Sequence, residues 1–159
     1  MIQHGPNRQH MPRDRNAVVH KFSIGAHEGY LHVGLFPDGR PGEIFVKMNK
    51  QGSTISGLMD AIALLTSLCL QYGVPLEVLA SKMQHTRFEP AGYTGNPEQP
   101  HATSVLDYIF RFLGRRFVPG FELSIEPPID LASDVIATMD PTKDLPFGSV
   151  DGVPSGEAP

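Results

Sequence analysis

The chain has 159 residues, about one domain's worth, and 40% of them are hydrophobic. Its 17 acidic residues outnumber its 13 lysines and arginines, and the resulting net charge of −4 disfavours a general nucleic-acid binder, which needs a basic surplus. The single cysteine excludes an internal disulfide framework and a zinc site built from several thiolates.

Composition divides the chain into three parts. Residues 1–16 hold few apolar side chains and are predicted to be a flexible arm, residues 17–117 are predicted to be the folded domain, and residues 118–159 form a Pro/Gly-rich, largely disordered tail. The longest apolar stretch, residues 61–70, is about half the length of a membrane span, and the N-terminal residues lack the apolar core of a secretory signal. We therefore expect a cytoplasmic protein with neither a membrane nor a nucleic acid as its partner.

The first half of the domain has the residue pattern of a sheet. Apolar and polar residues alternate in three segments, which predicts strands at residues 17–24, 30–36 and 43–48. Residues 25–29 are predicted to be a loop between the first two strands. Residues 37–40 predict a hairpin turn, because Pro37 presets its own φ and Gly39 accepts a positive φ.

A long apolar helix is predicted after Gly52, with Ser53 or Thr54 as its N-cap. Apolar residues recur there at the helical spacing i, i+3, i+4, i+7. The members of this predicted stripe are Ile55, Leu58, Met59, Ile62, Leu65, Leu68 and Cys69. A helix this apolar is expected to pack against the sheet or against a second subunit.

Two further helices are predicted, over residues 76–83 and about residues 103–113. The later helix is expected to bury Val105, Leu106, Ile109, Phe110 and Leu113. Asp107 and Arg111 lie one turn apart and are expected on its exposed side. The predicted fold is therefore α+β, with a three-stranded antiparallel meander packed against about three helices.

Residues 84–100 form a long segment, rich in polar and aromatic residues, between the last two predicted helices. Ordered loops of this kind often carry binding residues. We interpret His85, Arg87, Tyr93 and Asn96 as candidates for contact with a ligand or partner, since arginine binds phosphate and aromatic rings stack on bases. The alternative is that Arg87 pairs with Glu89 and that the loop packs on its own aromatic residues.

Other candidate sites are weaker. The backbone amides near Ser53 and Thr54 suit an anion, although an ordinary helix cap explains the same residues. None of the seven histidines pairs with another at metal-ligand spacing, so no metal site is predicted. Cys69 lies between two leucines and is expected to behave as a small hydrophobic residue. No catalytic or cofactor-binding residue is predicted.

Three motifs identify the chain more specifically than these patterns. They are G-x-H-E-G-Y at residues 25–30, G-S-T-I-S-G-L-M-D at residues 52–60 and H-T-R-F-E-P-A-G-Y-T-G-N-P at residues 85–97. From about His20 to Phe117 the sequence closely resembles the C-terminal TSCPD-type domain of adenosylcobalamin-dependent (vitamin B12, class II) ribonucleotide reductases. The string Thr-Ser-Cys-Pro-Asp that names the domain does not occur here, so the resemblance is to the reductase-type variant.

The resemblance implies a role in ribonucleotide reduction without the catalytic equipment. The family uses adenosylcobalamin to generate a thiyl radical in a ten-stranded barrel and takes its reducing equivalents from cysteine pairs. A chain of 159 residues with one cysteine lacks both, so the resemblance implies an accessory component. Its expected partner is a catalytic chain, which would hold the adenosylcobalamin. The alternatives are a nucleotide-binding regulatory module and a homodimeric structural domain that pairs through its apolar helix.

Overall fold

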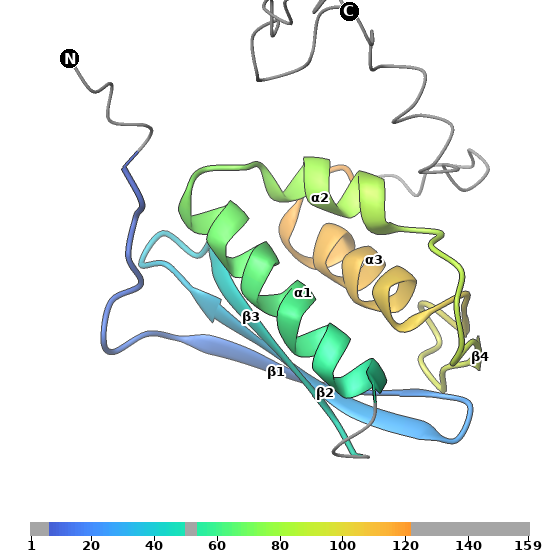
Figure 1. Ribbon diagram of the computed structural model, residues 1–159. Coiled ribbons are helices and arrows are strands. Elements are labelled where there is room, and N and C mark those ends of the chain that lie inside the picture. The colour runs from blue at the N-terminus through green and yellow to red at the C-terminus, as the bar shows by residue number, and fades with distance from the viewer. Residues whose placement is uncertain (1–6, 50–53, 122–159) are drawn as a thin grey trace, which may run out of the picture. The chain divides into compact units, whose positions relative to one another are not determined.

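The computed structural model describes residues 7–49 and 54–121. The elements, in chain order, are β1 (Ala17–Ile24), β2 (His27–Leu35), β3 (Pro41–Met48), α1 (Thr54–Gln71), α2 (Leu76–Met83), β4 (Gly92–Tyr93), β5 (His101–Ala102) and α3 (Val105–Phe117) (Figure 1). The first three strands form an antiparallel sheet in chain order, and β4 pairs with β5. The predicted α+β fold, a three-stranded meander with three helices, is confirmed.

The turns of the meander are tight. Phe36 N–H donates to the Arg40 carbonyl at 2.8 Å, and Gly39 has a φ of 86°, so the predicted hairpin turn is confirmed. The predicted loop over residues 25–29 is wrong in extent, because β2 already begins at His27. The ladder closes with Ile24 opposite His27, which leaves only two residues for the turn.

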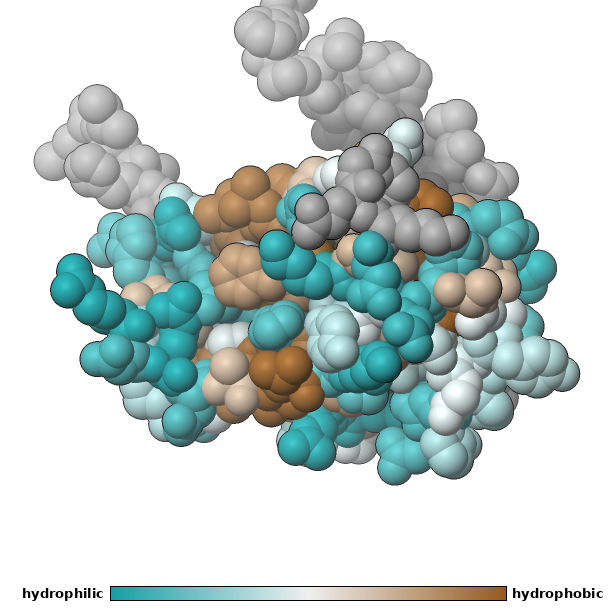
Figure 2. Space-filling model, turned by 90° about the horizontal axis from the view of Figure 1, so that it is seen from below, coloured by the Kyte–Doolittle hydropathy of each residue, from teal (hydrophilic) through white to brown (hydrophobic). Residues whose placement is uncertain are grey.

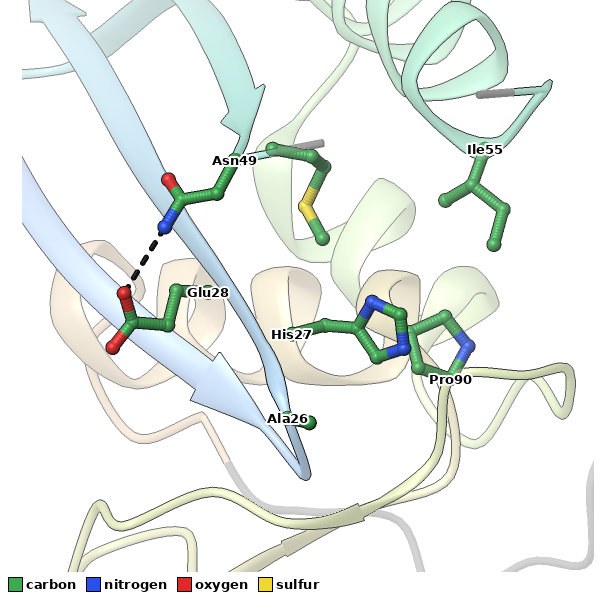
Figure 3. Close-up of a pocket in the computed structure, with 7 residues that line it drawn as sticks. Ala26, His27, Glu28, Asn49, Ile55 and Pro90 are labelled. Carbon is green, nitrogen blue, oxygen red and sulfur yellow. Dashed lines mark hydrogen bonds between the residues drawn. The ribbon is translucent and has the colours of Figure 1, made fainter. Parts of the chain in front are cut away.

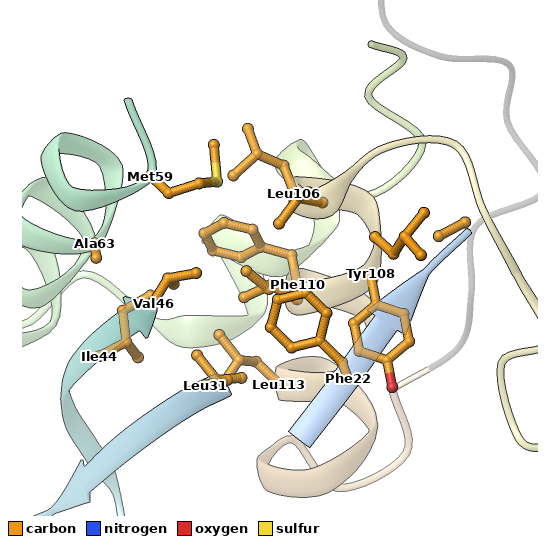
Figure 4. Packing of buried hydrophobic residues seen from close by; sticks show 14 of the residues in the cluster. Phe22, Leu31, Ile44, Val46, Met59, Ala63, Leu106, Tyr108, Phe110 and Leu113 are labelled. Carbon is orange, nitrogen blue, oxygen red and sulfur yellow. The ribbon is translucent and has the colours of Figure 1, made fainter. Parts of the chain in front are cut away.

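The three helices lie on one face of the sheet (Figure 1). Between them and the strands lies a core that includes Phe22 and Leu31 from the sheet, Met59 from α1 and Phe110 from α3 (Figure 4). All five α3 residues predicted to be buried are buried. Ser104 caps α3 by accepting a hydrogen bond from Asp107 N–H at 3.0 Å.

The opposite face of the sheet is open to solvent. Figure 2 views the molecule from that side and shows hydrophobic patches among hydrophilic side chains. One cross-strand row on this face joins Val19, His32 and Phe45. Val19 and Phe45 are both more than half exposed, so the sheet is covered by helices on one side only.

Helix α1 packs with a face that overlaps the predicted one only in part. Of the seven residues in the predicted stripe, only Met59 is buried, and Leu58 and Leu65 are more than half exposed. The face that packs comprises Met59, Ala63, Thr66, Ser67, Leu70 and Gln71. Ile55 and Ile62 are partly buried and pack against the core with Met59, so the predicted packing face of α1 is confirmed for these three residues and wrong for Leu58, Leu65, Leu68 and Cys69.

Hydrogen bonds to β3 explain the orientation of α1. β3 is an edge strand, and Ile44 N–H donates to Ser67 Oγ at 2.9 Å. Gln71 Nε2 donates to the Gly42 carbonyl at 2.9 Å. These side chains satisfy backbone groups that the edge of a sheet would otherwise leave unpaired. The polar partners thus set which face of α1 meets the sheet.

Residues 7–16, the described part of the predicted arm, contact this same end of the domain. Gln9 N–H donates to the Gln71 carbonyl at 2.9 Å, and Leu35 N–H donates to the Asn16 carbonyl at 2.9 Å. Arg15 forms an ion pair with Glu43. Residues 1–6 and the predicted tail beyond residue 121 lie outside the described residues.

Candidate functional site

A small cavity lies where four segments of the chain meet at one end of the sheet (Figure 3). It has a volume of about 190 Å³. Its lining residues come from the β1–β2 turn and β2, from the end of β3, from the first turn of α1 and from the long loop. They are Ala26, His27, Glu28, Met48, Asn49, Ile55 and Pro90. The fold therefore brings distant parts of the sequence to this one site.

The cavity combines apolar walls with a polar rim. The His27 ring lies beside Pro90, with Ile55 across from it (Figure 3). Asn49 Nδ2 donates to Glu28 Oε2 at 3.0 Å, and Lys21 Nζ lies 3.5 Å from the other oxygen of that carboxylate. Because drug-sized ligands fill cavities of roughly 300–1,000 Å³, this one suits a single planar ring or a small polar group.

The long loop is fixed to α3 by one buried carboxylate. Asp107 is fully buried and accepts hydrogen bonds from His85 N–H at 2.7 Å and from Thr103 N–H at 3.0 Å. Its charge is balanced by Arg111 Nη1 at 3.2 Å. The prediction that Asp107 lies on the exposed side of α3 is therefore wrong, because the loop backbone folds over it. Asp107 positions the loop, and its oxygens are already occupied.

A second, partly buried network ties the loop to β1. The Tyr108 hydroxyl lies 2.9 Å from His20 Nε2 and accepts a hydrogen bond from Asn96 Nδ2 at 3.0 Å. Burial lowers the pKa of His20, and the nearby Arg116 lowers it further. Burial is also the largest cause of the raised pKa of Tyr108. Burial thus favours the neutral form of both groups, and the hydrogen bond from Asn96 to Tyr108 positions the loop.

The four predicted loop residues lie in separate surroundings, and none of them lines the His27 cavity. His85 has a φ of 65° and binds Asp107 through its backbone. Arg87 is exposed, and no ion pair joins it to Glu89 among the described residues. Tyr93 is 80% exposed and meets the edge of His101, with 5.9 Å between ring centroids. A shared ligand site for these residues stays a prediction.

Asn96 and the predicted anion cap have surroundings of their own. Asn96 lines a polar cavity of about 340 Å³ together with Phe112, Arg115 and Arg116, among others. Thr54 is the first residue of α1, next to the cavity residue Ile55. Ser53 lies outside the described residues, so the anion cap also stays a prediction.

Metal-binding groups do not gather in the part of the chain that the structure describes. Over residues 7–49 and 54–121, no group of three or more His, Cys, Asp or Glu side chains is placed to hold a metal ion. His27 and Glu28 are neighbours on β2, and successive strand residues point to opposite faces of the sheet. This pair is therefore not arranged as a chelate.

Sequence reasoning missed the His27 cavity, although its signal was in the three motifs. The motif at residues 25–30 supplies three lining residues, the motif at residues 52–60 supplies Ile55, and the motif at residues 85–97 supplies Pro90. Their convergence depends on the tertiary fold. It makes the cavity the feature that the most specific parts of the sequence share.

The profile of the TSCPD domain matches residues 5–117, which is most of the chain and all of its described helices and strands. The chain belongs to the TSCPD domain family. The resemblance drawn from the three motifs is confirmed by this match. No solved structure matches this TSCPD domain.

Similar proteins carry this TSCPD domain as a small part of a longer chain. A vitamin B12-dependent ribonucleotide reductase of Rhodopirellula baltica is 54% identical over 123 residues, covering 77% of this chain and 12% of the relative. Reductases of the same name from Streptantibioticus cattleyicolor and Bradyrhizobium diazoefficiens are 45% and 40% identical, over 75% and 81% of this chain. The chain spans 20% and 10% of those two relatives. It is thus homologous to one domain of these enzymes.

Proposed function

We propose that this chain is an accessory component of a vitamin B12-dependent ribonucleotide reductase and is not catalytic alone. The observation that carries the proposal is the 54% identity over 123 residues to a reductase of which the chain spans only 12%. In this proposal the chain binds a catalytic chain and supports the reduction of ribonucleotides to deoxyribonucleotides.

The thiol content of the chain supports the non-catalytic part of the proposal. Replacing the ribose 2′-hydroxyl by hydrogen consumes two electrons, which a pair of thiols supplies by forming a disulfide. This chain has a single cysteine, Cys69, and that residue is half-buried on α1. One thiol cannot form that pair within the chain.

The cavity at the three motifs is too small for the cofactor that the reductases' name implies. Adenosylcobalamin carries a corrin macrocycle that is larger than the ligands of ordinary pockets. The His27 cavity, at about 190 Å³, does not fit it. In this proposal the catalytic chain holds the adenosylcobalamin.

Complementation of a truncated reductase tests the proposal. The matching segment is deleted from the Rhodopirellula baltica relative, and cobalamin-dependent formation of deoxyribonucleotides is measured with and without this chain. We expect added chain to restore turnover and to show none by itself. A chain with Leu113→Asp, which places a carboxylate in the core, is the control and should restore nothing. Unchanged turnover, or turnover by this chain alone, would contradict the proposal.

A second candidate function, a nucleotide-binding regulatory module, is favoured by the convergence of the three motifs on the His27 cavity. Its apolar walls and one imidazole suit a nucleobase. A ligand that binds only the folded state raises the melting temperature. Under this proposal ATP or dATP raises it in the wild type, His27→Ala abolishes the rise, and Arg87→Ala retains it. The reverse pattern would assign the site to the loop, and a flat titration with every nucleotide would exclude both.

A further inference from the structure

Among the described residues, helix α1 leaves an apolar stripe largely uncovered. The stripe comprises Leu58, Ala61, Ile62, Leu65, Leu68 and Cys69, with Tyr72 just after the end of the helix. Leu58, Leu65 and Tyr72 are 55%, 62% and 48% exposed, Leu68 and Cys69 are half-buried, and only Ile62 packs in part against the core. The stripe contains no Asp, Glu, Lys, Arg or His, and Asp60 is the only such residue in the whole helix. A monomer in water gains nothing from displaying such a surface.

The spacing of the stripe is the same in both chain directions. Counted from Leu65, its members lie at −7, −4, −3, 0, +3, +4 and +7. A two-fold axis through Leu65 that reverses the helix therefore places Leu58 opposite Tyr72 of the second copy. The same operation places Ile62 opposite Leu68 and Leu65 opposite itself. Isologous dimers need self-complementarity of this kind.

The size of the stripe is in the range that a dimer needs. Leu58, Leu65 and Tyr72 are each about half or more exposed and together offer roughly 300 Å². A standard interface buries about 800 Å² per partner, so these three side chains alone provide more than a third of that area. The rest would come from the half-buried members of the stripe and from flanking residues.

We propose that α1 packs antiparallel against α1 of a second copy of this chain, about a two-fold axis at Leu65. The opposite face of α1 is already occupied, because Ser67 and Gln71 bind the backbone of β3. The pairing therefore buries both sides of the helix and leaves the β3 contacts intact. The inference concerns α1 alone and does not rest on the proposed role in ribonucleotide reduction.

A membrane is the competing occupant. Among the described residues α1 is the one helix that is long and apolar enough to cross a bilayer, and a third of it is buried within the domain. The hydrogen bonds of Ser67 and Gln71 to β3 place the sheet directly against the helix, where a spanning helix would need lipid or another helix. The second copy is therefore the occupant that the contacts favour.

Sedimentation velocity on the full chain tests the proposal. We expect the wild type to form a dimer as its concentration rises and Leu65→Glu to remain monomeric with an unchanged helix signal in circular dichroism. Val19→Glu is the matched control, because Val19 is 58% exposed on the open face of the sheet, and it should dimerise like the wild type. A wild type that is monomeric at every concentration would overturn the proposal. If that monomer also sediments with lipid vesicles, the membrane is the occupant of the stripe instead. A dimer that Leu65→Glu leaves unchanged would overturn it too.

Disulfide trapping tests the direction of the pairing. In the antiparallel arrangement, Cys69 faces Ala61 of the second copy, and the two Cys69 residues are separated by about 12 Å along the axis, too far for a disulfide. We expect mild oxidation to leave the wild type uncrosslinked and to crosslink the Leu65→Cys, Cys69→Ser variant. Rapid crosslinking through native Cys69 would show a parallel pair and overturn the two-fold at Leu65.

Discussion

Helices α1 and α3 cover the same face of one sheet, but they contact it with different chemistry. α3 buries the side that carries Ile109, Phe110 and Leu113, so its apolar stripe lies within the domain. α1 buries three polar residues beside three apolar ones and turns Leu58 and Leu65 outward; the buried residues are Met59, Ala63, Thr66, Ser67, Leu70 and Gln71. Apolar periodicity thus does not by itself identify the face of a helix that packs within its own domain.

The two helices also differ in the interactions that hold them in the domain. α3 depends on apolar burial and on the buried carboxylate of Asp107. α1 combines apolar burial of Met59 and Ala63 with side-chain hydrogen bonds to an edge strand. Such hydrogen bonds contribute little net energy when made and cost more when one partner is lost. Four substitutions test whether the two helices are held in these different ways.

The largest effect is expected from Phe110→Ala on α3. Phe110 is 1% exposed, and removing its ring leaves a cavity, so we expect the free energy of unfolding to fall by about 3–5 kcal/mol. Urea denaturation measures the loss. Leu64→Ala on α1 is the control and should change stability by less than about 1 kcal/mol, because Leu64 is 62% exposed. Equal losses of stability for the two substitutions would contradict the claim that α3 buries its apolar residues within the domain and that α1 leaves Leu64 exposed.

Asp107→Asn is expected to lower the free energy of unfolding by about 3 kcal/mol, because an amide group faces donors that the carboxylate had satisfied. Hydrogen exchange should also become faster at His85 and Thr103, whose N–H groups bind Asp107. Asp60→Asn, on the exposed side of α1, should leave both measurements unchanged. Unchanged exchange in the Asp107 variant would show that the loop is held by other contacts.

A smaller effect is expected from Ser67→Ala on α1. The substitution removes the acceptor of Ile44 N–H, so we expect a loss of about 1–2 kcal/mol in the free energy of unfolding. Ser81→Ala is the matched control, because the Ser81 hydroxyl also donates to a carbonyl of its own helix but is exposed. If both substitutions cost the same, the bond to β3 does not orient α1.

The smallest effect is a pH dependence from His20, which packs against α3 with 4.0 Å between its ring centroid and that of Phe112. Burial lowers the pKa of folded His20 below its ordinary value of about 6.5, so the unfolded state takes up this proton first as the pH falls. Stability from this group is therefore present above pH 6.5 and is lost below it. The decline in melting temperature between pH 7.5 and 5.5 should be shallower for His20→Phe than for the wild type. Parallel profiles would argue against the neutral His20–Tyr108 contact.

Local signals predicted the parts of the fold that local chemistry determines. The turn at residues 37–40 follows from Pro37 and Gly39, and α3 follows from its Ser104 cap and apolar spacing. The orientation of α1 was not predictable in this way. It depends on a hydrogen bond between Ser67 and Ile44, 23 residues apart, which periodicity does not report.

The candidate site was predicted less well than the fold. Spacing does not fix side-chain direction in an irregular loop, so Tyr93 and Asn96 turned out to lie in different surroundings. The His27 cavity is assembled from four segments, and its outline required the fold. The motifs nevertheless marked the segments that meet there.

The central claim is that this chain takes the place of the equivalent segment in a vitamin B12-dependent ribonucleotide reductase. Isothermal titration of the chain into two forms of the Rhodopirellula baltica relative tests it, one complete and one without the matching segment. The account predicts binding to the shortened form only, because the complete enzyme already carries this domain. Binding to neither form, or equally to both, would contradict it.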